Sequence, residues 1–227
     1  MATSCARFAS VRHEPGGSGR SLLTTNLEIV TADVKARDRD RYLSVLYAPA
    51  AARPALLALH GLDLELAQVV ASTSEPMLGE IRLAWWRDAL TALDGGSVPA
   101  QPLLALIAAE VLPRGVSGAD LALLEDRWLG LIGSDDVPDS HVAGGGALFA
   151  LLARLGGGEP QAARRLGEAW VVGEPAALPV APPLRPLLGL VQLAARDAAR
   201  ARAGQGREPR GSTARQLRLL ASVALGR

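Results

Sequence analysis

The sequence of 227 residues contains a single cysteine, Cys5, and very few aromatic residues. One cysteine excludes an intramolecular disulfide and any zinc site built from several cysteines, so a reducing, intracellular setting is the simplest interpretation. Aromatic residues make up 4% of the chain and the net charge is +1. Because a nucleic-acid surface needs concentrated positive charge or rings on which bases stack, we expect no nucleic-acid partner.

The sequence also lacks long apolar runs, and Lys35 is its only lysine. No uninterrupted stretch of about 18 apolar residues occurs, so we predict no transmembrane helix. Residues 1–25 carry several serines, glycines and arginines and are predicted to be disordered. Their composition resembles an organelle targeting peptide only weakly. Three locations therefore remain possible from the sequence: the cytoplasm, the periphery of the inner membrane and an organelle.

The whole sequence is 49% hydrophobic, and beyond residue 25 its apolar residues recur at helical spacing rather than alternating as in strands. We predict one all-α domain over 26–227, with a flexible linker at 204–211 before a last short helix. Five prolines exclude a regular helix over 173–186. The predicted helices cover residues 26–47, 53–71, 76–93, 103–112, 119–132, a segment beginning at 139, 161–172, 187–203 and 212–225.

Residues 74–90 are the most informative stretch, because two tryptophans, Trp85 and Trp86, stand side by side in it. On a helical wheel, Glu80, Arg87 and two neighbours form one narrow polar face, and large apolar residues cover most of the rest. A helix of this kind is usually buried in an all-helical protein. The charged face then either lies at a solvated edge or lines an internal cavity.

Several short stretches of the sequence form one recognisable pattern: Arg41-Tyr42-Leu43, Tyr47-Ala48-Pro49, Arg53 to Leu59, Glu65-Leu66-Ala67, Ser74 to Leu90, Val142-Ala143-Gly144 and, more loosely, Ala169-Trp170 and Arg215-Gln216-Leu217. Together these stretches resemble the squalene/phytoene synthase family, and most of all the branch that contains a mitochondrial complex I assembly factor. The resemblance covers roughly residues 38–227 and is specific over 41–90. It implies an isoprenoid-synthase-like helical bundle with a central cavity.

In active members of that family, paired aspartates hold Mg²⁺, and Mg²⁺ holds the diphosphate of a prenyl substrate. The resemblance places the first set of carboxylates near positions 67, 68 and 71, where this chain has alanine, glutamine and alanine. The second set belongs after Trp170, where only Glu174 follows, next to a proline. Both magnesium sites are therefore predicted to be missing, and no metal or other cofactor is expected unless the chain is nevertheless a transferase.

The residues that would face the cavity are the candidates for a ligand site. His60 and Asp63 share one helix face and could contribute to a metal site, although no third ligand is identifiable by spacing. Glu80 and Arg87 are predicted to form an internal pair that braces the cavity wall. Gly144 to Gly146 indicate close helix packing or space for a ligand. The full set of candidates is His60, Asp63, Glu80, Trp86, Arg87 and His141.

Three functions remain open from the sequence. The first is a family member without prenyl-transfer activity that binds a prenyl lipid or helps to assemble a respiratory complex at the membrane. The second is an active transferase that joins prenyl diphosphates head to head, and the third is a truncated paralogue without a stable role. Five arginines could contact anionic lipid heads or could simply be solvated: Arg196, Arg200, Arg202, Arg207 and Arg210.

Overall fold

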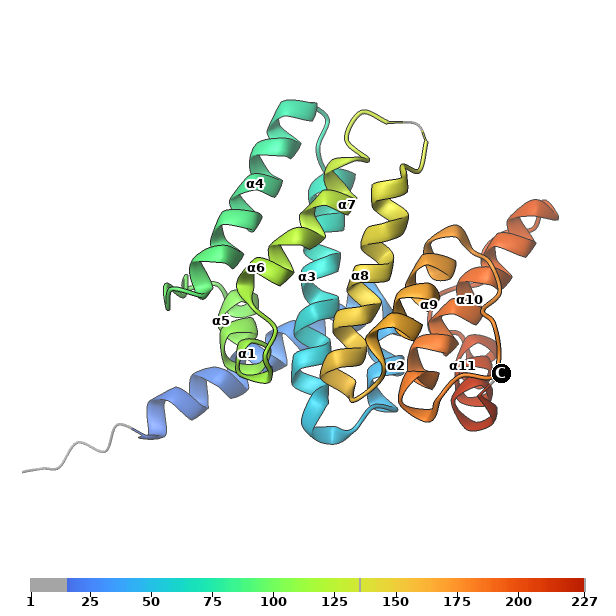
Figure 1. Ribbon diagram of the computed structural model, residues 1–227, viewed down its shortest axis with the longest axis horizontal. Helices are drawn as coiled ribbons and strands as arrows, with labels where there is room; N and C mark the ends of the chain where they lie inside the picture. The colour runs from blue at the N-terminus through green and yellow to red at the C-terminus, as the bar shows by residue number, and fades with distance from the viewer. Residues whose placement is uncertain (1–15, 135, 227) are drawn as a thin grey trace, which may run out of the picture.

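The computed structural model describes residues 16–134 and 136–226, and this part of the chain folds into helices without a strand, as predicted (Figure 1). Four short 3₁₀ turns, at 50–52, 112–114, 123–125 and 182–184, connect the α-helices. The α-helices are α1 (Gly16–Arg37), α2 (Arg39–Leu46), α3 (Arg53–Ala71), α4 (Pro76–Leu93), α5 (Pro102–Glu110), α6 (Gly118–Ala122), α7 (Asp126–Leu129), α8 (Asp139–Gly156), α9 (Pro160–Val172), α10 (Arg185–Arg202) and α11 (Thr213–Leu225).

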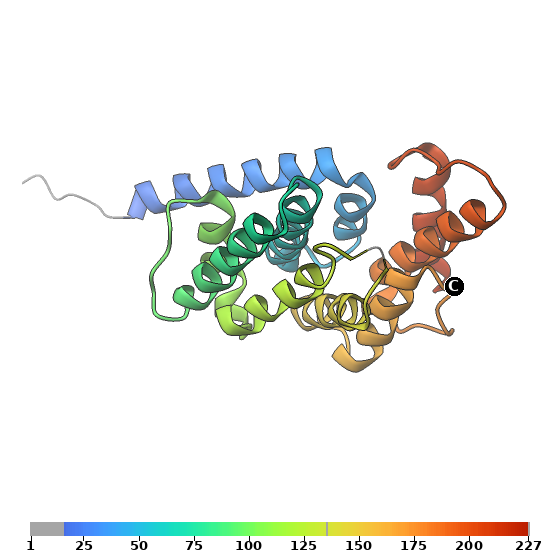
Figure 2. The same cartoon turned by 90° about the horizontal axis from the view of Figure 1, so that it is seen from above.

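Helix α3 is the centre of the core. Pro54 occupies its first turn, where no backbone N–H is needed, and buried residues cover nearly all of its circumference. Helices α1, α2, α4, α5, α7 and α8 all contact it. Figure 2 shows α1 along one edge of the molecule, with α10 and α11 at the end away from the beginning of α1. A helix surrounded in this way places its few polar residues inside the protein.

Helices α8 and α9 pack with their backbones in close approach, which explains the glycine run that the sequence shows. A side chain on Gly145 would overlap Val171, and one on Gly167 would overlap the carbonyl group of Gly145. A side chain on Gly144 would overlap Arg127. Of the two interpretations of the glycines, close helix packing is therefore confirmed at these positions.

Helices α9 and α10 run parallel. Leu184, just before α10, lies against Gly158 at the beginning of α9, and Ala198 lies against Gly173 at its end. The chain must therefore return along the whole length of α9 between the two helices (Figure 1). It does so over residues 174–184, which form no α-helix, as the prolines predict.

Three boundaries differ from the prediction. Helix α1 begins at Gly16, so residues 16–25 are helical rather than disordered; residues 1–15 lie outside the described part of the chain. The predicted helix 26–47 is broken at Asp38, whose carboxylate accepts hydrogen bonds from the backbone N–H groups of Asp40 and Arg41 and so begins a new helix. The predicted helix 119–132 consists of α6, a 3₁₀ turn and α7.

Helix α4 is not enclosed, contrary to the prediction. Leu83, Trp86 and Leu90 face the core, but the opposite face also carries large apolar side chains that are exposed to solvent. These side chains are Met77, Leu78, Ile81 and Trp85. The wheel pattern was ambiguous because a helix with two apolar faces resembles one that is buried all round.

Candidate functional site

Asp63 lies at the centre of a buried ion cluster on α3 and has no solvent exposure. Its Oδ2 accepts a hydrogen bond of 2.8 Å from Nη1 of Arg41. Its Oδ1 accepts two, each of 3.0 Å, from Nη1 of Arg127 and Nε1 of Trp128. Both oxygens of this carboxylate thus accept hydrogen bonds from donors on α2, which precedes α3 in the sequence, and on α7, which follows it.

Tryptophan rings and a histidine hold the two guanidinium groups in place. The guanidinium carbon of Arg41 lies 4.9 Å from the ring centre of Trp170, and that of Arg127 lies 5.5 Å from the same ring and 4.8 Å from Trp128. His141, in the first turn of α8, lies 2.8 Å through Nδ1 from the carbonyl oxygen of Arg127 and 3.3 Å through Nε2 from its Nη2. Protonated Nδ1 and unprotonated Nε2 satisfy both contacts.

The electrostatics of the cluster keep Asp63 ionised and His141 neutral. Burial alone would raise the pKa of Asp63, but the charges of Arg127 and Arg41, with hydrogen bonds from Arg41 and Trp128, hold it below its ordinary value. Burial, and then the charge of Arg127, lower the pKa of His141. The cluster is therefore arranged to hold one fixed carboxylate between two cations rather than to exchange protons near neutral pH.

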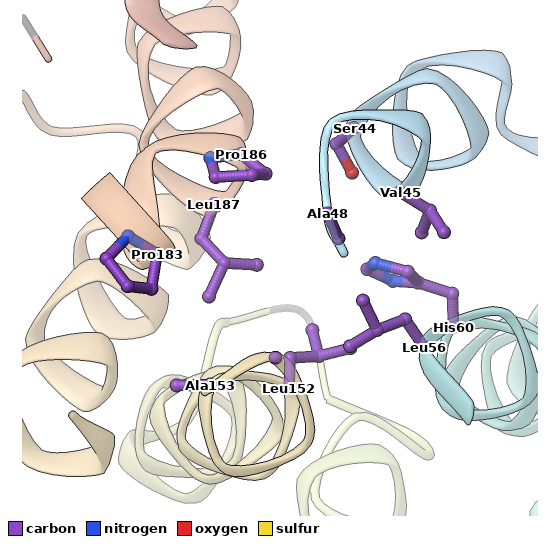
Figure 3. A pocket seen from close by; sticks show the side chains of 11 residues that line it. Ser44, Val45, Ala48, Leu56, His60, Leu152, Ala153, Pro183, Pro186 and Leu187 are labelled. Carbon is purple, nitrogen blue, oxygen red and sulfur yellow. The ribbon is translucent and has the colours of Figure 1, made fainter. Parts of the chain in front are cut away.

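His60 lies one turn before Asp63 on α3 and has an unsatisfied ring. Its Nδ1 is buried and has no hydrogen-bond partner in the described residues. Burial first, and then the charge of Arg41, lower its pKa to about 3, so the ring is neutral. Figure 3 shows the ring facing a hollow between α2, α8 and the beginning of α10. This hollow has a volume of about 20 Å³, which is enough for roughly one water molecule.

The other three candidates lie away from this cluster. Glu80 is exposed on α4, and no hydrogen bond or ion pair involves it in the described residues. The side chain of Arg87 is 49% exposed and lies 3.5 Å from Glu125, not against Glu80. The predicted internal pair of Glu80 and Arg87 is therefore wrong, because both positions fall on the solvent side of α4. Trp86 is buried in the core, with its ring centre 5.2 Å from that of Trp85.

The donor set for a magnesium ion is also absent from the described residues. No group of three or more histidine, cysteine, aspartate or glutamate side chains is placed to hold a metal there. Glu174 is exposed and faces Arg202 at 3.4 Å. The carboxylate of Asp63, at the centre of the bundle, is already paired with two arginines. The residues present do not fit the magnesium sites that the family resemblance implies.

The five arginines that were candidates for lipid contact all pair with carboxylates of the chain itself. Arg196 and Arg200 face Glu208, Arg202 faces Glu174, Arg207 faces Asp197, and Arg210 faces Asp38, at distances of 2.7 to 3.8 Å. Arg215 is buried between Asp40 and Asp197. These pairs fix the predicted linker at 204–211 and α11 to the rest of the bundle.

Sequence reasoning missed the residues that complete the Asp63 cluster. Arg41 and Trp170 stand in stretches that carry the family resemblance, but nothing in their spacing shows that they meet Asp63. Arg127 and Trp128 lie on a helix that the spacing of Trp128 and its neighbouring leucines predicts, but this spacing does not show that they meet Asp63. The sequence contains one signal that points to these residues. A buried carboxylate needs cationic partners, and arginines that lie close to tryptophans in the sequence are candidates for them.

One helical stretch of the described residues, Ala50–Ala71, is long and apolar enough to cross a membrane, and 67% of its most apolar window is buried in the protein. Pro102–Arg114 and Gly118–Leu129 pass the same criterion only together, across a bend of 120°. A buried core helix meets this criterion as well as a membrane helix does. Because α3 is enclosed by other helices, its apolar character is explained by the core.

Comparison with known proteins relates the first half of the chain to a family. Residues 34–115 match the squalene/phytoene synthase family. Complex I assembly factor 6 (NADH dehydrogenase, ubiquinone) of Bos taurus is 33% identical over 98 residues, which cover 42% of this chain and 28% of that protein. The Homo sapiens protein is 31% identical over 109 residues, which cover 42% and 32%, and the Rattus norvegicus protein is 36% identical over 98 residues, which cover 43% and 29%.

The chain thus spans about a third or less of the length of these relatives. No solved structure matches it significantly. The matched region contains α2, α3 and α4, and so includes Arg41 and Asp63 of the buried cluster. Residues 34–115 therefore belong to a squalene/phytoene synthase family domain, and the chain is distantly homologous to complex I assembly factor 6.

Proposed function

We propose that this protein is a family member without prenyl-transfer activity that takes part in the assembly of a respiratory NADH dehydrogenase. The observation that carries the proposal is the state of Asp63. Its two oxygens are held by Arg41 and Arg127 in a site with no solvent exposure. If that carboxylate held a magnesium ion instead, Arg127 would lose its only carboxylate partner within the described residues, and Arg41 would keep only its 3.4 Å contact with Asp38.

The bundle is, on this proposal, of the isoprenoid-synthase type with its centre occupied by protein side chains. Arg41, Arg127, Trp128 and Trp170 meet around Asp63. The hollow beside His60 holds about 20 Å³ and leaves no room for a prenyl chain. This arrangement supports assembly over lipid binding at the centre.

The outer face of α4 supports a role that depends on a protein partner. Met77, Leu78, Ile81 and Trp85 follow one side of the helix, and Met77 is 70% exposed. An exposed apolar stripe that includes a tryptophan is typical of surfaces that bind another protein. Unpaired Glu80 and the nearby Arg82 flank this stripe on its two sides, so a complementary partner helix would carry a charge of each sign.

The catalytic part of the proposal is tested with the purified chain, farnesyl or geranylgeranyl diphosphate and Mg²⁺. We expect no release of pyrophosphate above the rate measured without protein. Release that disappears in Asp63→Ala or His60→Ala, with helicity retained, would establish the transferase alternative instead.

The assembly part is tested by deletion of the gene in its native host, followed by measurement of intact NADH dehydrogenase on native gels. We expect less of the assembled complex, restored by the natural chain and not by the double variant Ile81→Ser/Trp85→Ser. Leu217→Ser is the matched control, because Leu217 is an equally exposed apolar residue on α11. Normal assembly in the deletion strain would contradict the proposal.

A further inference from the structure

The returning segment 174–184, which we call the strap, covers one face of α9 without filling the space beneath it. The hollow between them has a volume of about 480 Å³. That volume is in the range of small-molecule sites, roughly 300 to 1,000 Å³. It is also far larger than the hollow beside His60.

The hollow exists because small side chains line both of its walls. Ala162, Leu166 and Ala169 follow one face of α9 at helical spacing, and Ala176, Ala177 and Ala181 lie on the strap. Eleven of the thirteen lining residues are apolar. The prolines of the strap prevent it from coiling into a helix that would pack more closely on α9. An apolar chain could therefore lie between α9 and the strap.

The two charged residues at this hollow differ in what they can still bind. Glu159 is committed, because its carboxylate accepts hydrogen bonds of 2.7 and 2.6 Å from the backbone N–H groups of Gln161 and Ala162. Arg165 is exposed and makes no hydrogen bond or ion pair within the described residues. Its guanidinium group carries five N–H donors and no acceptor. Glu159 thus uses its oxygens on the backbone at the beginning of α9, whereas the donors of Arg165 are not used by any described residue.

The strap also carries backbone N–H groups that can donate hydrogen bonds. The N–H groups of Ala176, Ala177, Leu178 and Val180 make no hydrogen bond within the described part of the chain. These N–H groups, like the guanidinium group of Arg165, are therefore not used by other described residues. A cationic head would leave Arg165 without an acceptor and would be repelled by it.

We propose that the strap hollow binds an amphiphile that consists of one aliphatic chain and a single anionic head, either a carboxylate or a phosphate. The chain lies against the alanine-lined face of α9, and the head pairs with Arg165. This site is separate from the Asp63 cluster and does not depend on the proposed role in assembly.

The test is isothermal titration of the full chain with decanoate at pH 7.5, below the concentration at which it forms micelles. Decyl phosphate is the second anionic probe, and decan-1-ol and decyltrimethylammonium are the neutral and cationic probes of equal length. We expect saturable one-to-one binding of both anions. The neutral and cationic probes should bind at least roughly tenfold more weakly, as expected when a charge-assisted hydrogen bond is lost.

Variants locate the site. Arg165→Ala should weaken decanoate binding roughly tenfold, whereas Ala162→Phe should block it by filling the hollow from α9. Ala177→Phe fills the hollow from the exposed strap and serves if Ala162→Phe does not fold. Arg154→Ala is the matched control, because Arg154 is an exposed arginine on α8 outside the hollow. It should leave the affinity unchanged.

Three results would overturn the proposal: no saturable binding of either anion, equal binding of all four probes, or equal loss in Arg154→Ala and Arg165→Ala. Binding of phosphatidylglycerol vesicles without binding of the free anions would show a membrane-contact surface instead, and would also overturn it. If Arg165→Ala restores NADH dehydrogenase assembly in the deletion strain, ligand binding under the strap and the proposed role in assembly are independent of each other.

Discussion

Arginine is used in opposite ways at the centre of the bundle and under the strap. At the centre, Arg41 and Arg127 are buried, lie against tryptophan rings and share the carboxylate of Asp63. Under the strap, Arg165 is exposed beside a hollow of about 480 Å³ and has no acceptor in the described residues. At the centre each arginine has a carboxylate partner, whereas Arg165 has none within the described residues.

The difference indicates where a ligand could bind at low cost. A ligand at the centre would have to replace the carboxylate of Asp63 and leave buried charge unpaired, which costs several kcal/mol. A ligand under the strap would displace only water. The cluster around Asp63 is therefore a structural core in this chain, while the strap leaves open space beside α9.

The largest effect is expected from Asp63→Asn. This change removes the charge that Arg41 and Arg127 share, and breaking a buried ion pair in this way costs about 3–5 kcal/mol. Urea unfolding followed by circular dichroism measures the loss. Because the unpaired arginines cause it, Asp63→Leu/Arg127→Met should be more stable than Asp63→Leu alone. A loss below about 1 kcal/mol would show that the centre is not a saturated cluster.

A somewhat smaller loss is expected from Gly167→Ala on α9. The added methyl group would overlap the carbonyl group of Gly145, so α8 and α9 would have to separate. Overpacking of this kind costs about 1–3 kcal/mol. Gly156→Ala near the end of α8 is the control, because its added methyl group would meet no atom within 4 Å. Thermal unfolding of the two variants should therefore differ clearly; similar midpoints would contradict the close contact.

His60 should make stability depend on pH in a defined window. Its pKa is about 3 in the folded protein and 6.5 for the free side chain. Between these values the unfolded chain binds the proton and the folded protein does not. Stability therefore falls as the pH is lowered from about 6.5 towards 3, by at most about 1.4 kcal/mol per pH unit from this group.

The variant His60→Leu removes this group and should flatten the pH dependence in that window. It also removes the unsatisfied Nδ1 from the core. We therefore expect equal or higher stability near pH 5, measured by urea unfolding at several pH values. An unchanged slope between pH 6 and 4 would show that His60 is accessible to water in the folded protein.

The sequence was sufficient for the fold class and for the helices with clear ends. Helices α3 and α4 have the predicted bounds because Pro54 and Pro76 start them, and polar residues follow α3 while a glycine pair follows α4. The break between α1 and α2 was not predicted. Asp38 is one of several acidic and basic residues in this stretch, and its sequence context does not show that its carboxylate caps α2 and interrupts the helix.

The candidate sites were harder to predict for a physical reason. His141 contacts Arg127, a partner of Asp63, because α7 and α8 pack together, and helical spacing alone showed only that His60 and Asp63 share a face of α3. The hydrophobic pattern of α4 could not show which of its two apolar faces is buried. The strap hollow is the volume that small alanine side chains and a proline-rich, non-helical segment leave unfilled. A sequence pattern does not reveal an unfilled volume.

The smallest effect on stability is expected from Arg165→Ala. Because Arg165 is exposed and holds no carboxylate in the described residues, its removal should change the free energy of unfolding by no more than about 0.5 kcal/mol. Arg127→Ala is the matched comparison at the centre and should cost about 3–5 kcal/mol, because Asp63 would lose a buried partner. Urea unfolding of both variants measures the difference. A loss above about 1.5 kcal/mol in Arg165→Ala would mean that this arginine already has a structural partner, and the contrast between the centre and the strap would fail.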